Sequence, residues 1–224
     1  FPDVKSILVK HLDSAAGPYD INYYTYRALL LPSRRLRKTA EKFAKKFLRR
    51  PYLSAHVRRT DFVKHAHPES TPSLSVVAKA LTTISEKYRL RSIFVATDAT
   101  EEERQELRKQ NRRIVFFDQD LGHPGENALV EQWIAVFSNY FVGTQKSRFT
   151  LNIQEERDLM GIHVDRTWNH FCKDTSTLCP KPNWFKDYFS KCSYRTKMYG
   201  KLYESLKNPP ESLESPESPK KFDS

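Results

Sequence analysis

The chain has 224 residues, and its 38 Lys and Arg against 27 Asp and Glu give a formal net charge of +11. An aromatic content of 12% excludes a chain that is disordered throughout, and the length allows one large domain with a sizeable core. No apolar run approaches the roughly 20 residues of a membrane-spanning helix, so we expect no membrane span. The basic balance favours anionic partners, such as phosphorylated ligands or nucleic acid.

Before residue 52 the sequence predicts two elements. Residues 23–31 form a β-strand or an apolar packing segment that Pro32 closes. Ser33 is the predicted N-cap of a helix through Arg50, with apolar residues on one face and Lys and Arg on the other. We interpret the basic face as solvated, and nucleic-acid binding is the alternative interpretation.

From residue 52 onward, short apolar runs alternate with helical patterns. The predicted strands are 52–57, 92–97, 114–117 and 140–143, and the predicted helices are 71–88, one capped by Thr100, 128–138 and 147–160. Residues 122–125 form a loop, and Gly161 is suited to end the last helix. The alternation is typical of βαβ units and predicts an α/β fold with a parallel, doubly wound sheet.

Residues 56–62 read His-Val-Arg-Arg-Thr-Asp-Phe and overlap the end of the first of these strands. Open α/β sheets bind ligands at the carboxyl ends of their strands. An arginine there is permanently charged and forked, so it can hold two phosphate oxygens at once. The segment therefore predicts a site for a phosphorylated ligand, although two adjacent arginines in a basic chain can also be ordinary surface charge.

The cysteines and histidines allow fewer conclusions. Cys172 and Cys179 are near enough in sequence for a local disulfide, which would imply an oxidising compartment, but the spacing alone leaves this open. With Cys192 they make a poor zinc site, because no histidine stands at ligand spacing. We interpret His65 and His67 as loop residues, with metal binding as the alternative.

Several further segments follow the 56–62 motif along the chain. They are 94–99 (FVATDA), 131–134 (EQWI), 141–144 (FVGT), 147–149 (SRF), 153–161 (IQEERDLMG) and 169–172 (NHFC). Taken in this order, over about residues 20–190, they resemble the C-terminal half of the GDP-fucose protein O-fucosyltransferases. The resemblance implies a GT-B glycosyltransferase, in which two Rossmann-like halves face a cleft. This chain would be its Rossmann-like, nucleotide-sugar-binding half.

The resemblance also assigns residues that bind the donor. Arg58 matches a phosphate-contacting arginine and would stabilise the departing GDP, since a fixed cation stabilises developing negative charge. His56 and Val57 match positions that line the donor. Asp61 is expected to orient the loop or the arginine, and a helix or turn cap is its alternative role. Asp98, at the next strand end, is also expected near the phosphates.

Glu131, Ser147, Arg148 and Phe149 match further donor-binding positions, with two departures from the family pattern. Glu131 stands where the branch that this chain resembles usually has Asp, and a carboxylate there would accept from the N–H edge of guanine. Arg148 stands where that branch has a Thr that helps to hold the phosphates. The arginine either binds the phosphates by its charge or blocks the pocket by its size.

The function that the resemblance implies is that of an inverting peptide-O-fucosyltransferase in the lumen of the endoplasmic reticulum. It would move fucose from GDP-fucose to Ser or Thr hydroxyls of folded thrombospondin type 1 repeats, as a monomer and without metal or nucleic acid. The family's catalytic base is a glutamate of the N-terminal half, so we expect this chain to lack the base. Cys172 and Cys179 match a family disulfide.

The expected domain organisation follows from the same resemblance. Residues 1–32 would link to a missing N-terminal half, and residues 33–195 would form the nucleotide-sugar-binding domain. Residues 196–224 would form a basic helix or linker and a disordered tail, because their Pro-, Ser- and charge-rich sequence cannot bury a core. The alternative function is a non-catalytic Rossmann-like module that binds a nucleotide or nucleic acid.

Overall fold

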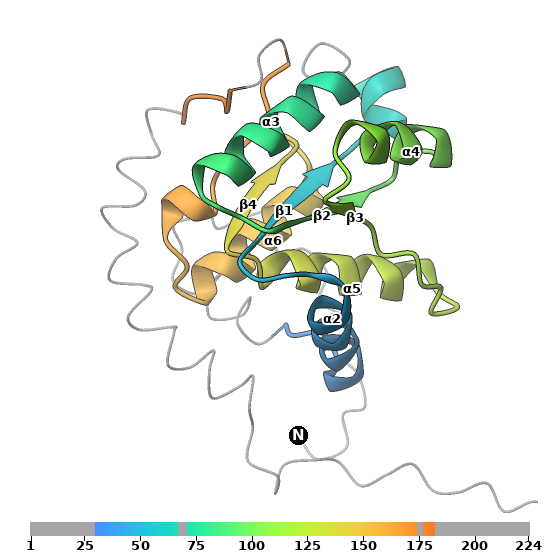
Figure 1. Ribbon diagram of the computed structural model, residues 1–224. Coiled ribbons are helices and arrows are strands. Elements are labelled where there is room, and N and C mark those ends of the chain that lie inside the picture. Colours follow the sequence, from blue (N-terminus) through green and yellow to red (C-terminus); the bar gives the residue numbers. More distant parts are fainter. Residues whose placement is uncertain (1–29, 67–70, 174–176, 182–224) are drawn as a thin grey trace, which may run out of the picture.

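The computed structural model describes residues 30–66, 71–173 and 177–181. Their centre is a four-stranded sheet in the order β3-β2-β1-β4 (Figure 1). The strands are β1 (Tyr52–Val57), β2 (Ser92–Thr97), β3 (Ile114–Val115) and β4 (Tyr140–Gly143). Every pairing is parallel, and β1 is bonded on both sides, with His56 level with Ala96 of β2 and Gly143 of β4.

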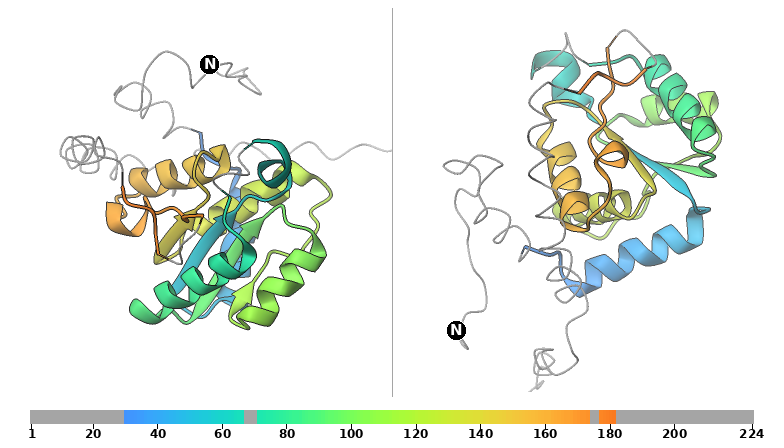
Figure 2. Two further views of the ribbon diagram at one scale, coloured as in Figure 1. Left: turned by 90° about the horizontal axis from the view of Figure 1, so that it is seen from above. Right: turned by 90° about the vertical axis from the view of Figure 1, so that its left-hand side faces the viewer.

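Helices cover both faces of this sheet, as the two further views also show (Figure 2). The main helices are α2 (Arg34–Phe47), α3 (Leu74–Lys87), α4 (Glu101–Gln110), α5 (Pro124–Val136) and α6 (Arg148–Leu159). One core cluster joins α3 and α4 to one face, and a second joins α2, α5 and α6 to the other. Two short turns complete the description, a π-helical turn over Phe62–Ala66 and a 3-10 turn over Val164–Arg166. The expected parallel, doubly wound α/β sheet is confirmed.

Local sequence signals set the helix starts. The side chains of Ser33 and Ser73 accept hydrogen bonds from the backbone of the first turns of α2 and α3. Thr100 and Glu103 form a reciprocal capping box at the start of α4. Gly161, with φ +73°, follows α6 in the left-handed conformation that a glycine adopts without strain. The predicted starts of α2, α4 and α6 are therefore confirmed, and so are β1, β2 and β4.

Several boundaries differ from the prediction. Helix α3 begins at Leu74 rather than at residue 71, so Pro72 lies before the helix and not in its first turn. Helix α5 ends at Val136 rather than at 138. Helix α2 ends at Phe47 rather than at Arg50. Helix α5 begins at Pro124, within the predicted loop, because proline fits the first helical turn and His123 Nδ1 accepts from Gly125 N at 3.1 Å. Strand β3 covers only half of the predicted 114–117, although Phe116 and Phe117 are buried. The predicted elements at 23–29 and beyond 181 lie outside the described residues.

The strand order places a topological switch point between β1 and β4. From β1 the chain crosses through α3 to β2 and through α4 to β3, and then returns through α5 to the other side of β1. Ligands of open α/β sheets bind at such a point, outside the carboxyl ends of the strands. The start of α6 approaches this edge closely, since a Cβ built on Gly143 would lie 2.3 Å from the Thr150 methyl carbon.

Candidate functional site

Arg58 follows β1 at the switch point, and two carboxylates hold its side chain. Its Nε donates to Asp61 Oδ1 at 2.8 Å, and its Nη1 lies 3.1 Å from Asp98 Oδ2. Its backbone N donates to Thr144 Oγ1 at 2.9 Å. The side chain is 35% exposed, and no contact of Nη2 with another described residue is recorded. Arg58 therefore has a fixed stem and a guanidinium edge that a ligand can reach.

Arg59 has a different role from its neighbour. Its Nε and Nη2 donate to Glu103 Oε1 at 3.0 and 2.8 Å, and its Nη1 donates to the Pro72 carbonyl oxygen at 2.9 Å. Only 13% of its side chain is exposed. It joins the end of β1 to the starts of α3 and α4. Arg59 is therefore held in structural contacts, whereas the Arg58 side chain remains 35% exposed.

Asp98, directly after β2, holds the three residues that follow β1. Its Oδ1 accepts from the backbone N of Arg59 at 2.6 Å, and its Oδ2 accepts from the Thr60 hydroxyl and pairs with Arg58. Asp61 lies on the other side of the Arg58 guanidinium. The hydrogen bond from Arg58 is the main reason why the pKa of Asp61 is lowered. Asp61 was expected either to orient the loop or the arginine or to cap a helix or turn. Its hydrogen bond with Arg58 supports orientation of the arginine.

Thr144 is a site residue that the sequence reasoning missed. Its hydroxyl donates to the His56 carbonyl oxygen at 3.1 Å and accepts from the backbone N of Arg58 at 2.9 Å. It is buried and fixes the end of β1 to the end of β4. Its position directly after a predicted strand was the available signal, because strand ends are where ligand sites form.

His56 connects β1 to the start of α6. Its ring stacks on Phe149 with 4.3 Å between centroids, and its Nδ1 lies 2.8 Å from Thr150 Oγ1. Burial, assisted by the charge of Arg58, lowers the pKa of His56 to about 3, so the imidazole is neutral at physiological pH. Thr150 is a second contact that was not predicted. The structure thus brings together His56 and Phe149, which were each predicted to bind the donor.

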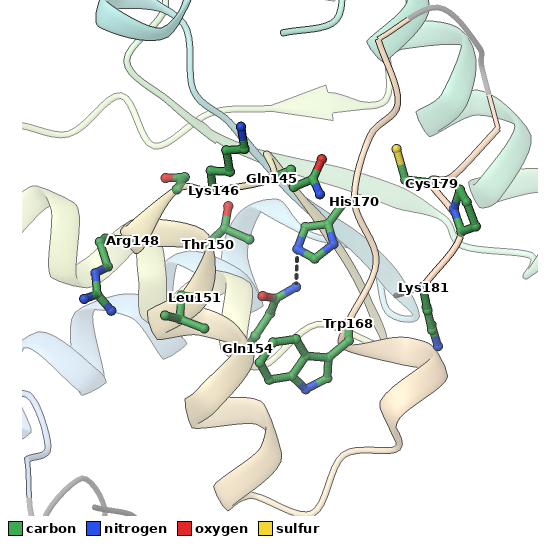
Figure 3. Close-up of a pocket in the computed structure, with 12 residues that line it drawn as sticks. Gln145, Lys146, Arg148, Thr150, Leu151, Gln154, Trp168, His170, Cys179 and Lys181 are labelled. Atoms are coloured by element: carbon green, nitrogen blue, oxygen red, sulfur yellow. Dashed lines mark hydrogen bonds between the residues drawn. The ribbon is translucent and has the colours of Figure 1, made fainter. Parts of the chain in front are cut away.

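The other predicted donor-binding residues near this edge lie in three different environments. They are Val57, Ser147 and Arg148. The Val57 side chain is buried in the core with α3, so its atoms near the edge are those of its backbone. Ser147 is the N-cap residue of α6, and its side chain makes no capping hydrogen bond. Arg148 is exposed in the first turn of α6, and it lies at the rim of a cavity of about 350 Å³ (Figure 3).

Glu131 lies on α5, towards the carboxyl ends of β2 and β3. Burial is the main reason why its pKa is raised to about 8. Asp118 and Asp98 raise this pKa further by repulsion, and Arg104 lowers it in part. At pH 7 this carboxyl group is therefore mostly protonated before any ligand binds.

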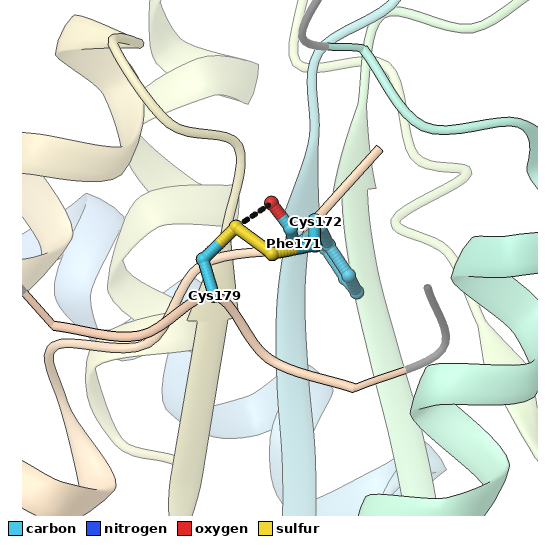
Figure 4. The surroundings of a disulfide bond; sticks show 3 residues. All are labelled: Phe171, Cys172 and Cys179. Carbon is cyan, nitrogen blue, oxygen red and sulfur yellow. Dashed lines mark hydrogen bonds between the residues drawn. A yellow bond between two sulfur atoms is a disulfide. The ribbon is translucent and has the colours of Figure 1, made fainter. Parts of the chain in front are cut away.

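The predicted disulfide between Cys172 and Cys179 is present, and it closes a short loop beside the end of β4 (Figure 4). Cys179 Sγ lies 3.4 Å from the Phe171 carbonyl oxygen. Phe171, directly before this loop, forms an antiparallel bridge with Leu178 inside it. Cys192 lies outside the described residues.

The described residues contain no cluster of three or more potential metal ligands. His65 is exposed and lies in the π-helical turn Phe62–Ala66, so the prediction of a loop residue is wrong there, and His67 lies outside the described residues. In the part of the chain that the structure describes, no helix is both long and apolar enough to cross a membrane.

Comparisons with known proteins agree with the fold and with the motif order. Residues 19–160 match the family model of the GDP-fucose protein O-fucosyltransferases. GDP-fucose protein O-fucosyltransferase 2 of Homo sapiens is 36% identical over 141 residues, which are 61% of this chain and 33% of that protein. The Caenorhabditis elegans protein of the same name is 33% identical over 148 residues, which are 64% and 35%. The chain thus spans about a third of the length of these relatives.

Solved structures support the fold. A structure of POFUT1 in complex with GDP superposes with a TM-score of 0.51 at 19% identity, over 64% of this chain and 50% of that one. A complex of POFUT1 with GDP-fucose gives 0.51 at 20% identity, over 64% and 48%. The architecture is therefore the Rossmann-like α/β fold of a GT-B transferase half. The chain belongs to the GDP-fucose protein O-fucosyltransferase family.

Proposed function

We propose that this chain is the donor-binding half of an inverting enzyme that transfers fucose from GDP-fucose to a protein hydroxyl. The proposed acceptors are Ser and Thr residues of folded thrombospondin type 1 repeats, and the proposed compartment is the lumen of the endoplasmic reticulum. The relatives carry the name GDP-fucose protein O-fucosyltransferase 2, and the related POFUT1 structures hold GDP and GDP-fucose. These names and complexes support the donor and the reaction class.

Arg58 is the observation that carries the proposal. Its side chain is held by Asp61 and Asp98 at the switch point and is still 35% exposed. A diphosphate leaving group gains negative charge as its bond to the sugar breaks, and a cation that is already in place stabilises that charge without reorganisation. Asp61 and Asp98 bind Nε and Nη1 of Arg58. We therefore expect the phosphate to contact the remaining nitrogen, Nη2.

The start of α6 supplies a second group of donors for the phosphates. The first backbone N–H groups of a helix have no partner within the helix, and they favour anions. The Ser147 side chain makes no capping hydrogen bond, so we expect its hydroxyl to be able to contact the same ligand. His56 and Phe149, stacked together, hold this helix start against β1.

Glu131 is the proposed contact for the guanine base. It lies near Asp98, which follows β2, and near Asp118, which follows β3, and we propose that the base of the nucleotide lies on that side of the edge. A carboxylate can accept both N–H groups of the guanine edge, but a protonated carboxyl group cannot. The raised pKa of Glu131 therefore makes guanine binding depend on pH.

Chemistry at a Ser or Thr hydroxyl also needs a general base within hydrogen-bond reach. The carboxylates of the described site already have other roles, since Asp61 and Asp98 hold Arg58 and Glu131 is assigned to the base of the nucleotide. We therefore propose that the base comes from an upstream half, and that this chain alone binds the donor but does not transfer fucose.

The first experiment measures binding to the 224-residue chain by titration calorimetry with GDP, GDP-fucose and a DNA oligonucleotide. Saturable binding of GDP that an oligonucleotide does not displace supports the proposal. If only the oligonucleotide binds, with an affinity that falls steeply with salt, the chain is instead a nucleic-acid-binding module. The matched variant Arg58→Ala separates the two, because it removes the proposed phosphate contact and only one charge of the basic surface.

The second experiment measures transfer from labelled GDP-fucose to a folded thrombospondin type 1 repeat. The chain is incubated alone and after the upstream half of the relatives has been joined to it. We expect label on the repeat only with the joined protein. Transfer by the chain alone would show that the general base lies within these 224 residues.

A further inference from the structure

His56 and Thr150 meet at the switch point, where β1 ends beside the first turn of α6 (Figure 3). Successive side chains of a strand point to opposite faces of the sheet. Ser54 donates to the Ala135 carbonyl oxygen of α5 at 3.1 Å, so His56, two residues later, faces the same layer of helices. There its Nδ1 lies 2.8 Å from Thr150 Oγ1. Thr150 has no part in the phosphate contacts proposed above.

The Thr150 hydroxyl is buried and has a single recorded partner in the part of the chain that the structure describes. Only 1% of Thr150 and 2% of His56 is exposed. The recorded hydrogen bond of Oγ1 is the one with His56 Nδ1. A buried hydroxyl hydrogen without an acceptor is costly. We therefore expect this hydrogen to point to Nδ1.

This contact determines which nitrogen of His56 carries the proton. The ring is neutral at physiological pH, because burial lowers its pKa to about 3, so it has one N–H and one acceptor nitrogen. If Nδ1 carried the proton, it would donate to Thr150 Oγ1, and the hydroxyl hydrogen would have no recorded acceptor. If Nε2 carries the proton, Nδ1 accepts from the hydroxyl and both groups are paired. The hydrogen-bond network therefore assigns the proton to Nε2.

His56 Nε2 is then an N–H donor that a ligand can reach. No hydrogen bond of this atom with a described residue is recorded, and it is not one of the side-chain nitrogens that are buried without a partner. It is therefore accessible to solvent, and so to a ligand at the switch point. An N–H group there can donate to an anion, whereas an unprotonated nitrogen would present its lone pair to the anion.

Gly143 of β4 provides the space that Thr150 occupies. It is level with His56 in the sheet. A Cβ built on Gly143 would lie 2.3 Å from the Thr150 methyl carbon and 2.6 Å from its Oγ1. Both distances are too short for atoms that are not bonded, so an alanine at this position would displace the hydroxyl from His56. The imidazole is also stacked on Phe149. The contact thus depends on β1, β4 and α6 together.

We propose that Thr150 is a positioning residue for donor binding. Its hydroxyl holds the His56 ring in place and keeps the proton on Nε2, so that a neutral imidazole donates to an oxygen of the bound nucleoside diphosphate. This role depends on the proposed function, because the diphosphate is the acceptor of the hydrogen bond. It differs from the role of Arg58, whose charge attracts the phosphates. A fixed neutral N–H adds no charge and orients one oxygen.

The first test measures the tautomer without ligand, by proton–nitrogen correlation NMR on the isotope-labelled 224-residue chain. His56→Gln identifies the signals of this ring. We expect the proton on Nε2 and a Nδ1 resonance that is displaced by a hydrogen bond. Thr150→Val keeps the shape of the side chain without its hydroxyl and should remove this displacement. Thr150→Ser keeps the hydroxyl and should retain it. A proton on Nδ1 in the unaltered chain would overturn the proposal.

The second test measures GDP affinity by titration calorimetry. Thr150→Val should weaken binding about fivefold, the effect of impairing one hydrogen bond, and Thr150→Ser should stay within about twofold of the unaltered chain. Gly143→Ala should also weaken binding, which keeps the test decisive if Thr150→Val does not fold. Thr39→Val, the same change on the surface of α2, is the control and should have no effect.

The outcomes separate this role from the donor site itself. Unchanged GDP affinity in Thr150→Val, or an equal loss in Thr150→Ser, would overturn the proposal, because the hydroxyl would then have no role beyond packing. If the unaltered chain does not bind GDP, the proposed donor site is contradicted. The NMR result still decides whether Thr150 holds the proton of His56 on Nε2.

Discussion

Glu131 should make GDP binding depend strongly on pH. The pKa of its side chain is about 8 before the ligand binds, and the guanine edge requires the ionised form. The fraction ionised rises from about 3% at pH 6.5 to about 76% at pH 8.5, so GDP affinity should rise roughly 25-fold over this interval. The interval lies above the second ionisation of a phosphate, near pH 6, which limits the contribution of the ligand.

The assay is titration calorimetry with GDP at half-unit steps of pH, for the unaltered chain and for Glu131→Gln. The amide does not ionise, so its GDP affinity should be weaker at pH 8.5 and nearly independent of pH. Glu106→Gln, a change on the exposed face of α4, is the control and should keep the original pH dependence. A flat profile for the unaltered chain, or an unchanged slope in Glu131→Gln, would refute the assigned contact.

The same carboxyl group should affect stability with a defined sign. Its pKa in the folded state lies above the ordinary value of 4.5, so the folded chain holds a proton that the unfolded chain has released. The free energy of unfolding should therefore fall as pH rises from about 5 to 8, by up to about 1.4 kcal/mol per unit, and level off above 8. Urea unfolding of the chain and of Glu131→Gln measures this without GDP.

Three further outcomes are expected. Arg58→Ala in the protein with its upstream half should lower transfer by about two orders of magnitude, and Arg58→Lys should not restore it, because lysine lacks the forked geometry; near-normal turnover in either variant would end the assignment. Thr144→Val should cost about 1–3 kcal/mol in urea unfolding, since the backbone N of Arg58 loses its acceptor, whereas Thr83→Val on the surface of α3 should cost little. Peptide mapping without reductant should find Cys172 joined to Cys179, and replacing both by Ser should lower stability by about 2–3 kcal/mol; two free thiols in protein from the secretory pathway would contradict the pairing.

The sheet and most helix starts could be predicted because their signals are local. Thr100 with the glutamates that follow it encodes a cap, and residues 52–57 and 92–97 are short, mostly apolar runs. The length of β3 could not be predicted, because it depends on which neighbours a strand finds in the sheet. The start of α5 was missed because a proline was interpreted as part of a loop when it occupied the first turn of a helix.

Within the site, residue identity could be predicted better than residue role. The segment 56–62 indicated an arginine at a strand end, but only the fold shows that Arg58 faces the edge while Arg59 is anchored to Glu103. Thr144 acts through contacts with residues far away in sequence, and no local pattern encodes such pairing. The raised pKa of Glu131 also depends on Asp98 and Asp118, which the fold alone brings near it.

The pairing of β4 with β1 has a consequence for how the protein is made. Leu53 pairs with Ile93 of β2, which follows after one crossover. It also pairs with Tyr140 of β4, which is synthesised only after all of the intervening chain. Contacts between distant residues form slowly, because a long loop must close first. A nascent chain that ends before Tyr140 holds Arg58 without Thr144 and presents β1 as an open edge. A nucleotide that binds the completed edge would then act as a folding ligand, since it stabilises only the state in which the last strand has docked.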